Sequence, residues 1–290
     1  MKRPALILVL SICISSFSMA DRWLPIEKTE FYSENREYML RIRPDEERLT
    51  RPGHCAATLY QGKKKIWSRN LINNYAPHRV FVSNSGKYVV TTDDWGAVGD
   101  TPIVIYGGSG RLIVVHSLLS LDLIKNIYQI TTSRSGAWWD ESSITFFCQD
   151  DEFLCVRLKW GEMLFIRTDC GSVIGRMGSP LNGGWRIGED AYEKLTKMAH
   201  EKANKMIIDM LSSTDPKKRE TAALFCGQEK LVETAPVLRK MLADRASYVT
   251  RRLGGIVRVY YIREAARDAL VKMGHKIEGV MILEEIAEED

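Results

Sequence analysis

A polar turn followed by an apolar, β-prone run recurs along the chain, and this period limits the possible folds more than any other feature. The segments are YSENREYML, VSNSGKYVV and TSRSGAWW, in which the serines Ser33, Ser83 and Ser133 stand fifty residues apart. A repeat of about fifty residues that contains several short strands is typical of a chain built from successive antiparallel sheets. The first part of the chain is therefore predicted to be a repeated β structure.

A second set of positions holds glycine between two β-prone runs, where a residue that tolerates positive φ makes a tight turn. These glycines are Gly62, Gly110 and Gly161. Each unit then reads as turn, strand, loop, strand, glycine turn and strand, and the units resemble blades of the large WD, kelch and NHL propeller class. The resemblance implies an antiparallel β domain of three blade-like repeats over residues 21–182. A β-sandwich, an open curled array and a ring completed by a second chain remain alternatives.

The β-type alternation stops at glycines in residues 183–188, which are predicted to form a linker. Apolar residues at helical spacing follow, and Asp215-Pro216 has the composition of a helix start. The segment IREAARDALVKMG, with Arg263 followed by small alanines, resembles the first helix of a HEAT repeat of the bacterial phycobilisome-lyase-like type. That resemblance implies a HEAT-like α-helical domain over residues 189–290, so the expected fold class is α+β.

The first twenty residues, MKRPALILVLSICISSFSMA, have the pattern of a secretory signal peptide. Lys2 and Arg3 precede an apolar run that is shorter than the roughly 20 residues a membrane-spanning helix needs. Small residues at Ser18 and Ala20 suit a signal peptidase, so cleavage after Ala20 is predicted. The mature protein is expected to be exported, periplasmic or secreted, with no transmembrane segment.

The charge of the chain argues against nucleic-acid binding. The formal net charge is +4, and Lys2 and Arg3 supply two of those positive charges. A nearly neutral mature protein lacks the strong basic footprint of a dedicated nucleic-acid binder. The partner is expected to be another protein.

Export allows disulfides, and five cysteines remain after the predicted cleavage. Cys148 and Cys155 bracket the segment QDDEFL. If Asp151-Glu152 is a two-residue hairpin loop, the two cysteines lie opposite one another and form a cross-strand disulfide. The alternative is a pair of buried free thiols.

The segment TTDDWGAVGDTP joins two predicted strands and contains the ligand-binding candidates Asp93, Asp94, Trp95 and Asp100. Carboxylate oxygens suit a hard cation, and a tryptophan can form an aromatic platform, but the spacing matches no calcium loop. A plain polar loop is the alternative. Because the histidines are scattered and show no pair at ligand spacing, no metal and no cofactor is predicted.

Basic residues are concentrated between Arg239 and Lys276. Arg251, Arg252 and Arg258 are the candidates for binding a partner, which would then be acidic. A solvated basic face with local ion pairs is the alternative interpretation.

No phosphate-binding loop, nucleophile elbow or zinc-protease motif is present in the sequence. The expected function is that of an exported, non-catalytic binding or scaffold protein acting through protein or ligand contacts. The alternative is an extracytoplasmic enzyme with its site near the Asp93–Asp100 loop. A polar pocket gathering His54, Asp93 or Asp94, and His116 would favour the enzyme.

Overall fold

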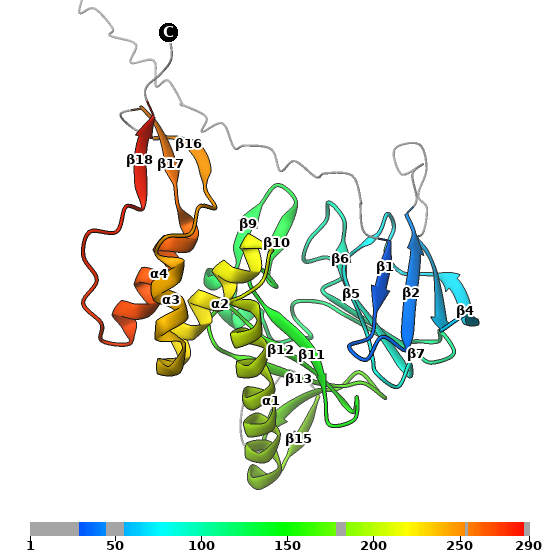
Figure 1. Ribbon diagram of the computed structural model, residues 1–290. Helices are drawn as coiled ribbons and strands as arrows, with labels where there is room; N and C mark the ends of the chain where they lie inside the picture. Colours follow the sequence, from blue (N-terminus) through cyan, green and yellow to red (C-terminus); the bar gives the residue numbers. More distant parts are fainter. Residues whose placement is uncertain (1–28, 45–54, 178–183, 253–254, 287–290) are drawn as a thin grey trace, which may run out of the picture.

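The computed structural model describes residues 29–44, 55–177, 184–252 and 255–286. The predicted signal peptide lies outside the described residues. Three large sheets come first in the chain, with a two-stranded sheet between the second and the third, and helices and a small three-stranded sheet follow (Figure 1). Among the described residues, no helix combines the length and apolar character that crossing a bilayer requires.

The first two sheets are four-stranded antiparallel meanders in which neighbouring strands follow one another in the sequence. The strands of the first are β1 (Glu30–Tyr32), β2 (Tyr38–Arg43), β3 (Ala56–Gln61) and β4 (Lys64–Asn70). Those of the second are β5 (Pro77–Val82), β6 (Tyr88–Asp94), β7 (Ile103–Gly107) and β8 (Leu112–His116). The two sheets share one hydrophobic core, in which Leu40, Leu59, Val89 and Tyr106 are fully buried.

The third sheet has five strands, the last of which runs parallel to its neighbour. Its strands are β11 (Ile144–Cys148), β12 (Phe153–Arg157), β13 (Met163–Arg167), β14 (Val173–Arg176) and β15 (Trp185–Ile187). Between the second and third sheets the chain forms a 3-10 helix, η1 (Ile124–Gln129), and a hairpin of β9 (Thr131–Ser133) and β10 (Gly136–Trp138). This segment between β8 and β11, called the excursion below, shifts the third repeat to a later position in the sequence.

The predicted period holds between the first two sheets and fails at the third. Ser33 and Ser83 occupy equivalent turns, and their hydroxyls accept hydrogen bonds from the backbone N–H groups of Tyr38 at 3.1 Å and Tyr88 at 3.0 Å. Ser133 instead ends β9. The equivalent turn of the third sheet begins at Gln149, because the excursion displaces it.

The glycine positions are displaced in the same way. Gly62 and Gly110 lie in the last hairpin turn of their sheets, with φ of +55° and +78°. Gly161 has positive φ but lies one hairpin too early, between β12 and β13. The equivalent residue is Gly171, between β13 and β14, with φ of +74°.

The first hairpin turns of the three sheets contact one another in a row. The backbone N–H of Asn35 donates to Oδ1 of Asn84 at 2.9 Å, and Nδ2 of Asn35 donates to the backbone carbonyl of Asn84 at 3.1 Å. The backbone N–H of Ser85 then donates to Oδ2 of Asp151 at 2.9 Å. Equivalent corners of the sheets are therefore held together by residues far apart in the sequence.

Replacement of Gly86 by alanine is expected to destabilise the protein much more than the same change at Gly62. Both residues have positive φ, which costs a non-glycine residue about 1–2 kcal/mol. A Cβ at Gly86 would also overlap the ring of Tyr38, whereas one at Gly62 would meet no atom within 4 Å. Overpacking adds about 1–3 kcal/mol at Gly86. Urea unfolding of both variants measures the difference, and equal midpoints would contradict this account.

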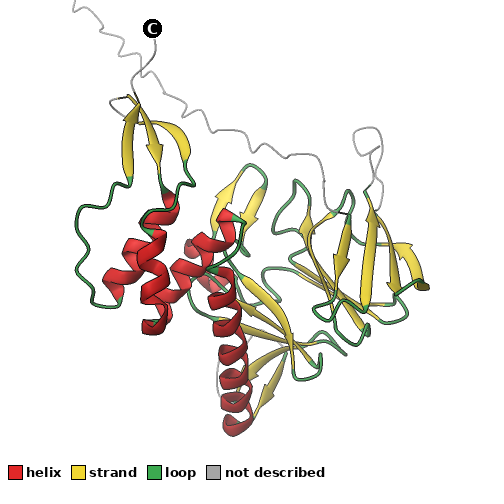
Figure 2. Ribbon diagram, in the orientation of Figure 1, coloured by secondary structure: helices red, strands yellow, loops and turns green. Residues whose placement is uncertain are grey.

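The prediction of a HEAT-like α-helical domain over residues 189–290 is wrong. The helices are α1 (Glu189–Met210), α2 (Pro216–Glu229), the 3-10 helix η2 (Val232–Thr234), α3 (Ala235–Met241) and α4 (Tyr261–Lys272). A three-stranded antiparallel sheet interrupts them, formed by β16 (Tyr248–Arg252), β17 (Gly255–Val259) and β18 (Leu283–Ile286). Figure 2 shows that strands continue past the helices, so the chain as a whole is β-rich.

Two physical features explain this correction. Residues 248–259 include three valines, one isoleucine, one threonine and one tyrosine, residue types that favour a pleated strand over a helix. The apolar stripe of α1, formed by Leu195, Ala199, Ala203 and Ile207, belongs to one core with Phe146, Phe165 and Ile174 of the third sheet. Helix α1 therefore covers a β-sheet as well as contacting α2, and stacked helical hairpins alone do not form this core.

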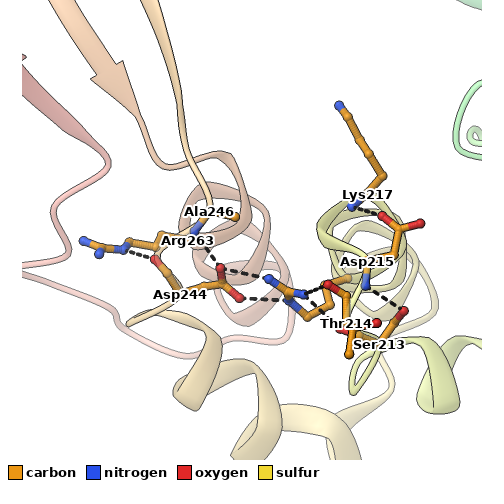
Figure 3. Close-up of polar contacts among 8 residues, drawn as sticks. Ser213, Thr214, Asp215, Lys217, Asp244, Ala246 and Arg263 are labelled. Carbon is orange, nitrogen blue, oxygen red and sulfur yellow. Dashed lines mark hydrogen bonds and ion pairs between the residues drawn. The ribbon is translucent and has the colours of Figure 1, made fainter. Parts of the chain in front are cut away.

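Some local helix predictions are confirmed. Asp215 caps α2, since its Oδ1 accepts a hydrogen bond from the backbone N–H of Lys217 at 2.9 Å (Figure 3). Gly227 does not end this helix, which continues to Glu229. It permits close packing instead, because a Cβ there would lie 2.7 Å from the Cα of Ala269 in α4.

Candidate functional site

An open pocket of ≈ 880 Å³ lies between the first hairpin turns of the three sheets and one side of α1. It is lined by two kinds of group, apolar walls and a charged or polar rim. The lining residues are Glu34, Asn84, Ser85, Phe147, Cys148, Gln149, Asp150, Asp151, Met198, Glu201, Lys202, Lys205, Met206 and Asp209. The pocket exists because distant turns and a helix meet there.

Helix α1 is held across this pocket by Lys202. Its Nζ forms an ion pair with Oε2 of Glu34 at 3.0 Å, which links the helix to the first sheet. The same Nζ lies 5.8 Å from the ring centroid of Phe146, on β11 of the third sheet. One side chain thus bridges the first and third sheets beside the pocket.

The turn from the third sheet carries local backbone strain. Gln149, Asp150 and Asp151 all have left-handed backbone conformations, with φ of +54°, +53° and +69°. Surrounding contacts hold this geometry: Asp151 accepts the hydrogen bond from Ser85, and Oγ1 of Thr168 donates to the backbone carbonyl of Asp151 at 2.6 Å. Strained backbone of this kind is concentrated at binding and catalytic sites.

The charges of the pocket are predominantly negative. Five of its lining residues are acidic and two are lysines. One of these lysines, Lys202, is already paired with Glu34. The walls include Phe147, Met198 and Met206, and methionine adapts to ligands of different shape. The site can therefore hold a cationic group attached to an apolar body.

Cys148 lies at the wall of the pocket, beside Cys155. The strand register places Cys148 opposite Phe153 and Cys155 opposite Phe146, so the two cysteines are diagonal neighbours, not directly opposed as predicted. Both are free thiols here, and the turn between their strands is longer than two residues. A hydrogen bond from the Cys155 thiol lowers the pKa of Cys148 to about 7, and the pKa of Cys155 is raised. The disulfide between them stays a prediction.

Alkylation of Cys148 in the reduced protein is expected to accelerate through pH 7. Replacement of Cys155 by alanine removes the hydrogen bond to the thiolate and should move this midpoint towards the ordinary thiol value of 9.0. Mass spectrometry of peptides labelled at different pH values measures the shift, with the exposed Cys170 as the internal reference. A midpoint unchanged in the Cys155→Ala variant would contradict the assigned cause.

The predicted ligand loop does not gather its carboxylates at one point. The Asp94 carboxylate caps a backbone turn, with Oδ2 accepting from the N–H of Asn74 and Oδ1 from that of Ala76, both at 3.1 Å. Asp100 is exposed. Asp94 therefore stabilises the fold, and Asp93 has a different environment.

Asp93 is fully buried and lies within 4.8 Å of the ligand atoms of His78 and Asp140. Its Oδ1 accepts a hydrogen bond from the backbone N–H of Gly99 at 2.7 Å, and its Oδ2 accepts from Nε1 of Trp139 at 2.8 Å. Burial, with a smaller contribution from Asp140, raises the pKa of Asp93 to about 8. The structure thus creates a titratable cluster that contains only one of the predicted candidates.

Aromatic rings surround the His78 side chain of this cluster. Its ring centroid lies 5.9 Å from that of Trp95 and 5.7 Å from that of Trp138. Trp95 is therefore a packing partner of the histidine. Sequence reasoning missed this cluster because no regular spacing relates its three residues. His78 is on β5, which pairs with β6, whereas Asp140 lies much later in the chain, after the β9–β10 hairpin.

Of the described groups chosen to indicate an enzyme, His116 does not belong to the cluster around Asp93. His54 lies outside the described residues. The ring nitrogens of His116 contact Oγ of Ser120 at 3.0 Å and the backbone carbonyl of Gly171 at 2.8 Å. Burial lowers the pKa of this histidine. These contacts show that His116 ties β8 to the last turn of the third sheet.

The arginine candidates lie on the small C-terminal sheet. Arg258, on β17, forms an ion pair with Glu284 of β18 at 3.0 Å, directly across the strands. Arg251 is exposed, and Arg252 is the last residue of β16. Arg258 is thus engaged within the sheet, and partner binding by Arg251 and Arg252 stays a prediction.

Other basic groups nearby are also paired. Nε of Arg219 lies 2.9 Å from Oδ2 of Asp244, and Nε of Arg263 donates to the Asp244 backbone carbonyl at 2.6 Å. Figure 3 shows Asp244 close to Arg263, at the junction of the helices with the small sheet. Arg263, which suggested a HEAT-repeat helix, therefore holds the loop that contains Asp244.

These features define a β-rich protein in which helices cover the third of three large sheets and a pocket lies where the first hairpin turns of all three sheets meet. No protein-family model matches the chain, and no curated protein sequence matches it. Among solved structures, the crystal structure of HIRA(644-1017) aligns with 85% of this chain and 92% of that chain, at 10% sequence identity and a TM-score of 0.26. A likeness at that level carries no argument about fold, family or function.

Proposed function

We propose that this is an exported, non-catalytic binding protein whose pocket holds a segment of a partner protein. The segment would place a lysine or arginine side chain beside an apolar residue. The observation that carries the proposal is the pocket itself, whose ≈ 880 Å³ lies within the range of ligand sites, about 300–1,000 Å³. The meander sheets whose first turns converge there are compatible with a propeller-like arrangement.

Charge complementarity supports a cationic segment. Glu201, Asp150 and Asp209 lie on the rim, and none of them has an ion pair among the described contacts. The apolar walls would contact the neighbouring side chain of the segment. A cationic partner segment therefore replaces the acidic partner that was expected from the arginine-rich segment. In that segment, Arg258 is already paired with Glu284.

The environment of Cys148 favours binding over catalysis. A thiol nucleophile needs a neighbouring base, and histidine is the usual one. The partner of Cys148 is the Cys155 thiol, which is itself a weak acid with a raised pKa. The thiol pair thus lacks the arrangement of a cysteine hydrolase.

A peptide-binding experiment tests this proposal. Fluorescein-labelled hexapeptides that combine lysine or arginine with leucine or phenylalanine are expected to bind in fluorescence anisotropy, whereas glutamate versions are not. The double charge reversal Glu201→Lys and Asp209→Lys should weaken binding at least tenfold, and added salt should weaken binding to the wild type. The matched control is Glu233→Lys, an exposed position outside the pocket. Preferred binding of the glutamate peptides, or equal loss in the control, would contradict the proposal.

The export step has its own test. N-terminal sequencing of the protein recovered from the periplasm or the medium should begin at or near Asp21, because the apolar run and the small residues before Ala20 predict signal-peptidase cleavage. A cytoplasmic protein that retains Met1 would contradict export, whatever the result of the peptide experiment.

A further inference from the structure

The buried cluster at the side of the second sheet has the composition of a metal site. His78 is on β5, Asp93 is on β6, and Asp140 follows the β9–β10 hairpin. One ligand atom from each of these residues lies within 4.8 Å of the other two. We propose that His78, Asp93 and Asp140 bind one divalent transition-metal ion of the zinc type. The proposal concerns residues outside the pocket, so it stands apart from the proposed function.

The state of Asp140 provides independent support for a bound cation. This residue is 1% exposed, and neither of its carboxylate oxygens accepts a hydrogen bond from any described residue. The nearest described cation is Nε of Arg79, 3.5 Å from Oδ2, which leaves Oδ1 with no described partner. Burial of an ionised carboxylate without hydrogen bonds is very costly, so such groups are usually paired or bound to a metal.

The other two ligands are already oriented by their neighbours. Asp93 accepts hydrogen bonds from Gly99 and Trp139, one on each oxygen, and each oxygen retains a lone pair for a metal. His78 is confined between the rings of Trp95 and Trp138. Outer contacts of this kind hold metal ligands in place and tune their basicity.

The donor set selects the class of metal. One imidazole nitrogen and two carboxylates suit zinc, manganese or iron(II), whereas Ca²⁺ takes six to eight oxygen ligands. Ligands of a tetrahedral zinc ion are about 3.3 Å apart, given metal–ligand distances of about 2.0–2.1 Å. The side chains would therefore draw together slightly when the ion binds.

Such an ion would connect the excursion between the second and third sheets to the second sheet. The backbone already makes this connection in part, since the N–H of Val98 donates to Ser135 at 2.8 Å and the N–H of Ala137 donates to Val98 at 3.0 Å. Asp140 follows directly in this segment, whereas His78 and Asp93 belong to the second sheet. The metal would add a cross-link between the two parts.

The experiment uses the full mature chain without an affinity tag and with its thiols reduced. After extensive chelation, Zn²⁺ is titrated calorimetrically, and Co²⁺ is used as a spectroscopic probe. One ion per chain and a rise in melting temperature with Zn²⁺ are expected. Asp140→Asn should lower the affinity at least about a hundredfold, because loss of a direct ligand should cost no less than loss of an outer-shell contact, which costs about 10–100-fold. Asp100→Asn, an exposed carboxylate of the same predicted loop, should leave it unchanged.

Two further measurements keep the proposal falsifiable. In metal-free protein, Asp140→Asn should fold about as stably as the wild type, because it removes a buried carboxylate that accepts no described hydrogen bond. His78→Gln provides a second test of the affinity loss. The Co²⁺ complex should lack thiolate charge-transfer absorption, since no cysteine belongs to the cluster. Absence of Zn²⁺ binding, binding unaffected by both variants, or a thiolate spectrum would overturn the proposal.

Discussion

A fragment of residues 189–290 is expected to aggregate or to form a helical state without a cooperative melt. In the whole protein, Leu195, Ala199 and Ile207 of α1 share one core with the third sheet. That core also includes Phe146 and Phe165, both of which the fragment lacks. Loss of the sheet would expose the apolar stripe of α1, and burial of apolar surface is the main stabilising contribution to folding.

Circular dichroism melts of the fragment and of the full mature chain, at equal concentration, measure this effect. Near-ultraviolet circular dichroism and dye binding distinguish a packed fragment from a molten helical one. A soluble, monomeric fragment that melts cooperatively near the temperature of the whole chain would show that residues 189–290 form an independent domain.

The second large effect is expected for Glu229→Ala, which should destabilise the protein by about 3–5 kcal/mol. The reason is Arg157, a fully buried residue of β12. Its guanidinium forms an ion pair with Glu229 of α2, contacts Nδ1 of His200 at 3.1 Å and lies 5.0 Å from the ring centroid of Phe225. Removal of Glu229 leaves a buried charge without its carboxylate.

Equilibrium unfolding in urea gives the change in the free energy of unfolding. The matched control is Glu220→Ala, on the same helix, whose lysine partner Lys217 has a side chain 80% exposed. That exposed pair should contribute no more than about 1 kcal/mol. The double variant Arg157→Met and Glu229→Leu should recover much of the lost stability, because an apolar pair no longer requires charge compensation. A loss below about 1 kcal/mol in Glu229→Ala would refute the assigned role of this pair.

Both predictions concern the same interface, and that interface also positions the pocket. Helix α1 packs its apolar stripe on the third sheet and directs Lys202 towards Glu34 of the first sheet. A change that loosens the helix should therefore weaken peptide binding along with stability. The charge reversals at Glu201 and Asp209 change the rim only, because both side chains are exposed.

Local features of the sequence predicted much of the secondary structure. The Ser33 and Ser83 turns occur where the period places them, because each depends on a hydroxyl and a backbone N–H five residues apart. The helix start at Asp215-Pro216 is equally local. Apolar, β-prone runs identified strands in the three sheets. Buried and exposed residues alternate in part of β2, whereas β7 and β12 are buried along nearly their whole length.

The predictions of a HEAT repeat and of a third repeat turn failed because the same local sequence pattern can occur in more than one tertiary arrangement. IREAARDALVKMG does form a helix, but small alanines allow close packing against any neighbour, and the neighbour of α4 is α2 beside a core that includes a β-sheet. Helix periodicity alone therefore could not distinguish a repeat from a covering layer. Similarly, the segment around Ser133 resembles the turns at Ser33 and Ser83, but it belongs to the hairpin of β9 and β10.

By itself, the sequence determined many of the turns, strands and helices, because hydrogen bonding and side-chain pattern within a few residues decide them, but it did not predict the strands β16, β17 and β18. Only the tertiary structure decided which distant groups meet. The pocket needs the turns of three sheets and helix α1 at one place, and the cluster needs His78, Asp93 and Asp140 on neighbouring segments. Such convergence depends on how the sheets pack, and burial in the assembled core then raises the pKa of Asp93, an effect that no local spacing encodes.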